Sequence, residues 1–352
     1  MHKPVMLFVA VALCAGAGQA AAQDRTVRDR SVTRDRVVFV ERYQGRDRGR
    51  DQREQQTDRS TRTLKIGANG ELHIANIAGD IVVTRGGGND ATVEIIKTAR
   101  GRTTEDAREM LELVQVDISE RGGRAEIKTR YPQGDEFRRN NRRNVNVSVD
   151  FNVTAPAGAR LTIHSISGNI SAKDIKGDLT LESVSGTIRI GNGGRVAAAK
   201  SVSGNVEVVD TEMDGHLEAS SVSGTVLLRN LKARELNVDS VSGGVSLQDI
   251  VCDRVEAQSV SGDVDFSGPL AKAGRYELTS HSGNVRVAVA GGTGFELEAS
   301  SFSGSVRSDI PLNAQANASS RRQQRTLRGI YGDGSAVLDL TTFSGSIVIT
   351  KR

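Results

Sequence analysis

The chain has 352 residues, enough for two or three average domains or for one elongated domain. Aromatic residues make up 3% of it, Trp is absent and Gly occurs 38 times, so a core built on large rings is disfavoured and a turn-rich β architecture is favoured. The 47 basic and 43 acidic residues leave a formal charge of +4, which gives little support for an anionic partner such as nucleic acid.

Residues 1–23 are predicted to be a secretory signal peptide. A basic start at His2 and Lys3 precedes a short apolar run and a small-residue cleavage site. The run is shorter than the roughly 20 residues that a membrane span needs, and Leu before Cys14 disfavours a lipid anchor. Cleavage would leave Cys252 as the one cysteine, so no internal disulfide and no transmembrane segment are expected in the mature chain. The expected location is extracytoplasmic, either periplasmic or at the cell surface.

Residues 24–62 are dense in Arg and Asp and contain one short apolar island near Val37. Such a segment buries too little apolar surface to offset its chain entropy, so a disordered linker is predicted. The interleaved Asp residues cancel most of the positive field, so nucleic-acid binding is not expected.

Residues 63–160 are predicted to form a β-rich cap without repeats. Alternating apolar residues in "ELHIANIAGDIVVT" and "NVNVSVDFNV" are typical of strands with one buried face. One helix is expected from Thr104 to about Val114, with Thr103 as its N-cap and acidic residues in its first turn.

A repeat near 20 residues occupies residues 161–352. Its corner glycines are Gly168, Gly186, Gly204, Gly224, Gly243, Gly262, Gly283, Gly304 and Gly345. Each unit carries apolar residues at period two on both sides of its glycine, which indicates two short strands closing on one core. A weaker second turn, as in "DIKGDL", "EMDGHL" and "IVCDRV", is expected to return the chain to the next unit. The predicted fold class is therefore all-β: a parallel β-solenoid of two-strand coils of about 19–20 residues, about 40 Å long, with the last unit closing the stack.

The Ser-x-Ser-Gly corner is interpreted as structural. Its first serine should point inward and bond backbone groups at the bend, while the glycine should supply a positive φ and a following Asn or Asp should suit the turn. This ladder comprises Ser183, Gly186, Ser201, Gly204, Ser221, Gly224, Ser240, Gly243, Ser259 and Gly262. Because no His or Lys accompanies the serines, no catalytic residue is assigned to them.

An outward row of acids is a candidate binding face: Glu256, Glu277, Glu298 and Asp339. Stacked like charges should attract Lys, Arg or a cation, although a solvated face with neighbouring bases is the plainer reading. The spacing also falls near that of glycosidase carboxylates, but any acidic stripe on a solenoid would show it. No metal site and no cofactor are expected, because Cys and His lack ligand spacing.

A basic loop at residues 311–334 is the second candidate contact site. It separates the last two repeat units, and long loops on rigid scaffolds often carry contacts. Its arginines are Arg321, Arg322, Arg325 and Arg328.

The order of "NIAGDIVV", a short helix, "IKTRYP", an Arg-rich hinge, tandem "SVSG" units and a closing "GDGSAVLDLTTFSGSI" resembles the bacterial putative-adhesin domain family, a β-solenoid domain of unknown function. The resemblance covers residues 63–352 and implies an extracytoplasmic domain without enzymatic activity. It brings no catalytic residues.

Three functions follow from these features. The first is a secreted, non-enzymatic binding or scaffold module of the cell envelope that contacts an envelope component or a partner protein. The second is an envelope-stress sensor that binds a regulatory protein, and the third, disfavoured for lack of clustered acids and bases in a cleft, is a polysaccharide-acting β-helix enzyme. End coils can also stack edge to edge, which would allow self-association.

Overall fold

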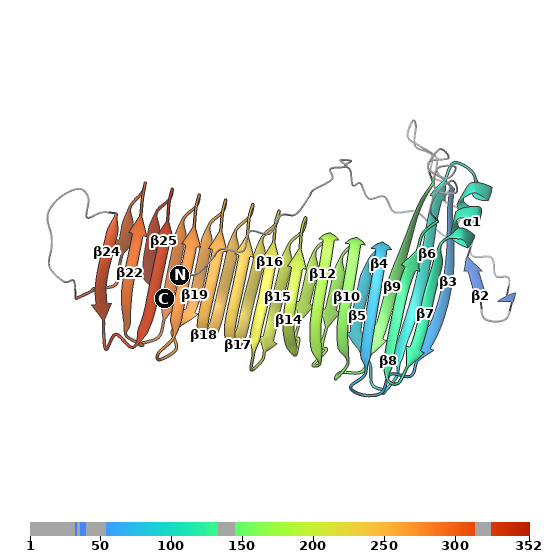
Figure 1. The fold of residues 1–352 in the computed structure, drawn as a ribbon, viewed down its shortest axis with the longest axis horizontal. Helices are drawn as coiled ribbons and strands as arrows, with labels where there is room; N and C mark the ends of the chain where they lie inside the picture. The colour runs from blue at the N-terminus through green and yellow to red at the C-terminus, as the bar shows by residue number, and fades with distance from the viewer. Residues whose placement is uncertain (1–31, 34–35, 40–53, 133–144, 314–324) are drawn as a thin grey trace, which may run out of the picture.

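The computed structural model describes residues 54–132, 145–313 and 325–352, together with the backbone of residues 32–33 and 36–39. These residues form an elongated stack of strands with one helix at one end (Figure 1). The fold is thus all-β and solenoid-like. The predicted signal peptide, most of the predicted linker, the Arg-rich hinge and two loop arginines, Arg321 and Arg322, lie outside the described residues.

Two sides of the stack carry most of the strands. In spatial order side A comprises β8 (Arg124–Arg130), β4 (Glu71–Ala78), β10 (Arg160–Ser167), β12 (Asp178–Ser185), β14 (Arg195–Ser201), β16 (His216–Ser221), the second parts of β17 (Val226–Ser240) and β18 (Val245–Ser259), β20 (Arg275–Ser280), β25 (Ala336–Thr342) and β22 (Phe295–Ser301). Side B comprises β9 (Asn146–Ala155), β5 (Ile81–Arg85), β11 (Ile170–Lys173), β13 (Ile188–Gly191), β15 (Val206–Glu212), the first parts of β17 and β18, β19 (Val264–Pro269), β21 (Val285–Ala290), β26 (Ile347–Lys351) and β23 (Val306–Ser308).

Successive coils pair in parallel and place like residues over like. Leu161 pairs with Leu179, Val226 with Val245 and Val264 with Val285. Alternate residues of sides A and B point into one continuous apolar core, in which Ile163, Leu181 and most of their equivalents are fully buried. Each such side chain contributes about 1.5–3 kcal/mol through its burial, so the stack is held by a repeated apolar layer and by backbone pairing.

A second corner lies at the end of side B, and at Asp174 it falls in the weaker turn expected in "DIKGDL". The Asp and Asn residues that form it were not predicted. Its residues adopt positive φ values of 49° to 60°: Asp174, Asn192, Asp210, Asn230 and Asp249. Asn and Asp are the non-glycine residues that tolerate this conformation best. Beyond this corner the central coils have a third side, where β17 and β18 continue as strands and Leu231 pairs with Ile250. The weak return turn expected in "IVCDRV" is therefore wrong, since these residues lie within β18.

The N-terminal end begins earlier than predicted. Strand β3 (Glu54–Leu64) pairs with β6 (Ala91–Gly101), so the linker prediction is wrong for residues 54–62. Most residues of this strand are polar, so its composition does not indicate a strand. It is stabilised instead by backbone pairing with β6 and by the packing of α1 against it, which depend on residues distant in sequence. The backbones of β1 (Val32–Thr33) and β2 (Arg36–Phe39) extend the same edge in antiparallel fashion.

The cap contains coils of the stack itself. Strands β4 and β5 pair in parallel with β10 and β11, and on their other side with β8 and β9. Antiparallel strands complete this end, with β6 on β9 and β7 (Gln115–Arg121) on β8. The helix α1 (Thr104–Leu113) packs on β3 and β6. Its N-cap prediction is confirmed, because the Thr103 hydroxyl accepts the backbone N–H of Asp106 at 3.1 Å.

The C-terminal end corrects another prediction. The last unit in sequence, β25 and β26, does not close the stack; it lies between β20/β21 and β22/β23 (Figure 1). The end of side A is formed by β22 and by β24 (Thr326–Tyr331), which pairs with β22 in antiparallel fashion. Six residues of the basic loop predicted at residues 311–334 therefore form a strand, β24, that covers an end coil.

Candidate functional site

The corner serines are buried and donate hydrogen bonds. Each hydroxyl donates to the carbonyl oxygen of the corner glycine of the preceding coil, at 2.8 to 3.0 Å, in Ser201, Ser221, Ser240, Ser259 and Ser280. Thr342 and Ser301 continue the ladder into the last two coils. At the other end Ser165 and Ser183 have buried hydroxyls without a partner. The prediction that the Ser183 hydroxyl bonds a backbone group is therefore wrong.

The corner glycines are required for a different reason from the one predicted. Of the nine, only Gly168 has a positive φ, at 136°. At Gly224 an added Cβ would lie 2.3 Å from the carbonyl oxygen of Gly204, and at Gly186 it would lie 1.9 Å from that of Gly168. Successive corners thus approach so closely that no side chain fits between them.

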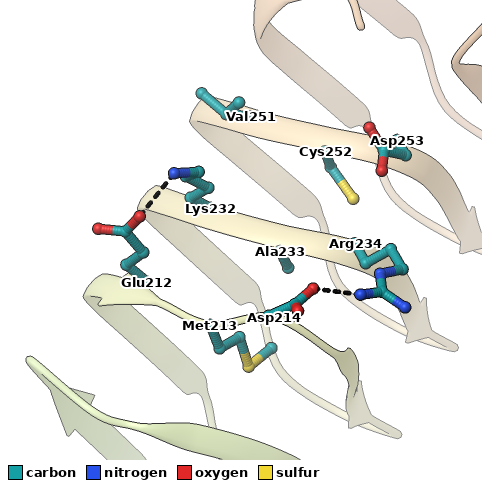
Figure 2. A pocket seen from close by; sticks show the side chains of 9 residues that line it. All are labelled: Glu212, Met213, Asp214, Lys232, Ala233, Arg234, Val251, Cys252 and Asp253. Carbon is teal, nitrogen blue, oxygen red and sulfur yellow. Dashed lines mark hydrogen bonds and ion pairs between the residues drawn. The ribbon is translucent and has the colours of Figure 1, made fainter.

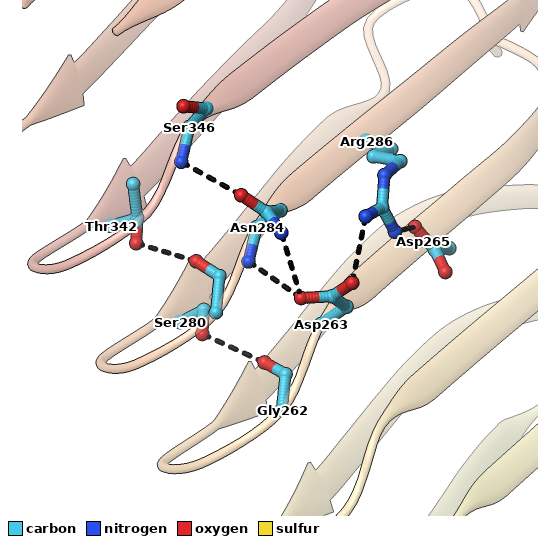
Figure 3. A network of polar contacts seen from close by, with 9 residues as sticks. Gly262, Asp263, Asp265, Ser280, Asn284, Arg286, Thr342 and Ser346 are labelled. Carbon is cyan, nitrogen blue, oxygen red and sulfur yellow. Dashed lines mark hydrogen bonds and ion pairs between the residues drawn. The ribbon is translucent and has the colours of Figure 1, made fainter. Parts of the chain in front are cut away.

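The residue after the glycine bonds to the next coil rather than to its own turn. The carboxylate of Asp263 accepts the backbone N–H of Asn284 at 2.8 Å, and the Asn284 side chain accepts that of Ser346 at 3.0 Å (Figure 3). Arg286 adds an ion pair to Asp263 at 2.8 Å. Burial opposes the charge of Asp263, but the bonds from Asn284 and Arg286 outweigh it and lower the pKa of this carboxyl.

These contacts give the corner a structural role, which is to hold successive coils together. The buried hydroxyls from Ser201 onward are committed to carbonyl oxygens, and the glycines are fixed by close approach. Nothing in this arrangement activates a nucleophile, which would need a hydroxyl oriented toward a base.

The acidic row of side A is brought together by the strand register. Glu256 pairs with Glu277, Glu277 with Asp339, and Asp339 with Glu298 on four adjacent strands. Their spatial order differs from their sequence order because β25 lies between β20 and β22. Nearby, burial raises the pKa of Asp239, and the charges of Glu256 and Glu218 raise it further.

Two arginines lie beside this row. Arg254 and Arg275 pair across β18 and β20, two residues before Glu256 and Glu277. Together with Val255 these four side chains line a shallow hollow of about 230 Å³. Cationic donors and anionic acceptors therefore face the same small volume, which can hydrogen-bond a polar ligand without a large net charge.

The basic loop and the acidic row meet at the end of the stack. Arg328 lies on β24 opposite Glu298 and forms an ion pair with it. Arg325 immediately precedes this strand and its carbonyl accepts the backbone N–H of Ser301. The two candidate sites predicted separately are thus neighbours.

A larger hollow, of about 430 Å³, lies on the third side and was missed by sequence reasoning (Figure 2). It is flanked by two ion pairs between successive coils, Lys232 with Glu212 at 2.6 Å and Arg234 with Asp214 at 2.5 Å. Both pairs are separated by 20 residues in sequence, so the repeat period combined with opposite charge could have indicated them.

Cys252 also lines this third-side hollow, but its thiol has low reactivity. Its thiol donates to the carbonyl of Arg254 at 3.0 Å, and burial raises its pKa to about 11. The thiol is therefore protonated at neutral pH and is a poor nucleophile.

Among the described residues, no group of three or more His, Cys, Asp and Glu side chains is placed to hold a metal ion. Within the same residues, no helix is both long and apolar enough to span a membrane.

Fold and surface together define a repetitive β scaffold with ordered polar faces. A family model described as Toastrack DUF4097 matches residues 69–350, and the chain belongs to this family. The resemblance to the putative-adhesin domain family is thereby confirmed. No curated protein matches the chain in sequence.

Several solved structures are similar to this chain at low identity. A putative adhesin from Bacteroides fragilis is 12% identical with a TM-score of 0.41, over 84% of this chain and 97% of that one. A putative adhesin from Parabacteroides merdae is 11% identical with a TM-score of 0.40, over 83% and 95%. A putative lipid binding protein from Parabacteroides distasonis is 12% identical with a TM-score of 0.37, over 84% and 96%. These values are too low to transfer a function.

Proposed function

We propose that this protein is a secreted, non-enzymatic binding module of the cell envelope that contacts a polar envelope component through side A of its C-terminal coils. The observation that carries the proposal is the in-register row of Glu256, Glu277, Asp339 and Glu298 beside Arg254 and Arg275.

The chemistry of this face suits a repetitive polar ligand. Carboxylates accept and guanidinium groups donate hydrogen bonds, and both recur at the strand spacing of about 4.8 Å. Their strands are paired on both sides, so binding would require little ordering of the protein. An extended polymer rich in hydroxyl or amine groups could therefore be contacted at several points at once.

The location is proposed from the sequence. The predicted signal peptide at residues 1–23 would deliver the chain to an extracytoplasmic compartment, where envelope polymers are accessible. An envelope-stress sensor that binds a regulatory protein through the same face is the alternative, and a polysaccharide-acting enzyme is disfavoured because the row offers no cleft.

Co-sedimentation with isolated cell envelopes across a salt series tests this proposal. The variant Glu256→Gln, Glu277→Gln, Asp339→Asn is expected to lose most binding. A control with the same loss of charge, Glu212→Gln, Asp214→Asn, Asp253→Asn on the third side, should bind like the wild type. A chain beginning at Glu54, where β3 begins, should also bind.

Two results would contradict the proposal. Equal loss of binding in both variants would indicate a general charge effect rather than a site. Binding that requires residues before Glu54 and is released by salt would move the contact to the Arg-rich segment.

A further inference from the structure

Each Ser-x-Ser-Gly corner places its second residue on the outside of the bend. In spatial order these residues are Ile166, Val184, Val202, Val222, Val241, Val260, His281, Phe343 and Phe302. We call them the corner ridge. Seven of them are exposed large apolar side chains, with exposed fractions from 38% to 66%.

The ridge is continuous and rigid. The backbone N–H of Val222 donates to Ser201, that of Val241 to Ser221 and that of Val260 to Ser240, and the ladder continues through His281 and Phe343 to Phe302. The ridge residues therefore follow one another at the strand spacing of about 4.8 Å. Association through it would involve no ordering of a loop.

Stacked rings form the C-terminal end of the ridge. His281 and Phe343 stack with centroids 4.9 Å apart and 10° between planes, and Phe343 and Phe302 stack at 4.6 Å and 6°. Phe302 nevertheless keeps 66% of its surface exposed. The stacked rings therefore still expose apolar surface that a partner could bury.

Scattered exposed valines are ordinary on a protein surface, but an unbroken row is not. Singly exposed apolar residues need no explanation, whereas contiguous patches beyond a few hundred Å² mark interaction sites. If each of the seven exposed apolar side chains exposes about half of roughly 150 Å², they offer on the order of 500 Å² per copy. The flanking serines, Val202 and His281 extend this surface toward the roughly 800 Å² that each partner contributes to a standard interface.

We propose that the corner ridge is the interface of a homodimer, in which two copies lie side by side with their ridges interdigitated about a two-fold axis. The occupant follows from the periodicity: a second ridge has the same spacing, so its side chains fit the gaps between neighbouring side chains of the first.

The charges beside the ridge favour a second copy over a lipid surface. Small serines flank it directly, and the next outward residues are mixed in sign, with Glu182 and Asp239 alongside Lys200. A lipid-facing edge would be expected to carry a basic margin. Because the ridge lies between sides A and B, the dimer leaves the acidic row of side A accessible, and the inference does not depend on the proposed function.

Sedimentation equilibrium of the full chain tests the dimer. The variant Val222→Ser, Val241→Ser, Val260→Ser is expected to raise the dimer dissociation constant at least about tenfold, because each substitution removes an apolar side chain that the dimer would bury. The control Val82→Ser, Val251→Ser, Val337→Ser removes three similarly exposed valines away from the ridge and should dimerise like the wild type. The single variant Val241→Lys, which places charge near the middle of the ridge, should act as the triple ridge variant does.

A monomeric wild type across the micromolar range would overturn the proposal, as would a ridge variant that is folded and dimerises unchanged. Floating the protein with neutral phosphatidylcholine vesicles identifies the other occupant. Binding by a monomeric wild type that the ridge variant loses would assign the ridge to lipid instead.

Discussion

The central coils and the two ends of the stack are built by different rules. From β12 to β19 every coil lies between its neighbours in sequence. At both ends this order breaks: β4/β5 lie between β8/β9 and β10/β11, and β25/β26 lie between β20/β21 and β22/β23. Antiparallel strands, β3 and β6 at one end and β24 at the other, lie outside these coils.

The difference shows how a repeat protein can protect its edges. A solenoid made only of sequential coils would end in open strands that can fray or recruit other chains. Here the segment near the C-terminus pairs on both sides, because Tyr276 and Leu297 both neighbour Leu338. Opening an end therefore requires the loss of pairing between segments distant in sequence, while the centre depends on close stacking of like residues.

The largest expected effect comes from breaking that close stacking in the centre. Gly224→Ala would set a Cβ 2.3 Å from the backbone oxygen of Gly204, so whole corners must move apart. We expect a loss of roughly 2–4 kcal/mol in the free energy of unfolding, measured in urea. Gly215→Ala is the matched control, since an added Cβ there meets nothing within 4 Å. Equal effects of the two substitutions would contradict this account.

The same substitution at an end sharpens the contrast. At Gly304 an added Cβ would lie 1.9 Å from the oxygen of Gly345, but the coil of Gly304 is the outermost on side B and can shift away from its one neighbour. We therefore expect Gly304→Ala to cost less than Gly224→Ala despite its shorter contact. Amide hydrogen exchange should show the change confined to β22 and β23. Loss of protection throughout the stack would indicate that the ends move with the centre.

Much of the centre could be predicted because its information is local. Period-two apolar residues around a recurring glycine identify two sides of a coil, and the register of Glu256 with Glu277 follows from aligning the units. The helix from Thr104 was also predictable, since its cap and first turn are encoded within a few residues.

The ends could not be predicted because they depend on pairing between distant segments. The sequence of the unit ending at Arg352 resembles one more coil at the end of the stack. Only its pairing with β20 on one side and β22 on the other shows that it lies between two earlier coils. For the same reason Arg328 appeared to belong to a loop, although it pairs with Glu298. The Asp and Asn residues of the second corner recur with the period of the repeat, since Asp174 and Asn192 are as far apart as Gly168 and Gly186. That spacing alone does not distinguish a corner from an exposed strand position, and only the positive φ values identify the corner.

A smaller effect is expected from the hydroxyl ladder, which differs along the stack. Ser221 donates to Gly204 at 2.8 Å, while the hydroxyl of Ser183 is buried without a partner. Ser221→Ala should therefore cost about 1 kcal/mol of unfolding free energy, because a carbonyl loses its donor. Ser183→Ala should be neutral or slightly stabilising, because it removes an unsatisfied polar group. Urea titrations of the two single variants measure the difference, and a larger loss at Ser183 would refute the assignment.

The smallest expected effect is electrostatic and opposite in sign in two regions. Asp150, at the N-terminal end, accepts the backbone N–H of Asp80 at 2.8 Å, as Asp263 accepts that of Asn284 in the C-terminal coils. Burial raises the pKa of Asp150 and outweighs the backbone N–H of Asp80, which lowers it, whereas the bonds from Asn284 and Arg286 lower the pKa of Asp263 against the effect of burial.

A lowered folded-state pKa means that Asp263 stabilises the fold above its unfolded pKa and that this contribution disappears as pH falls through the folded value. A raised one means that ionised Asp150 destabilises the fold at neutral pH, a penalty absent below the unfolded pKa. Asp263→Asn should thus lower stability at pH 7 by at most about 1 kcal/mol, since its ion pair is exposed and screened, while Asp150→Asn should raise it. Both differences from the wild type should shrink in urea titrations taken from pH 7 to about 2.5. If both variants shift stability in the same direction at pH 7, the equivalent carboxylates of the two regions are not distinguished by their surroundings.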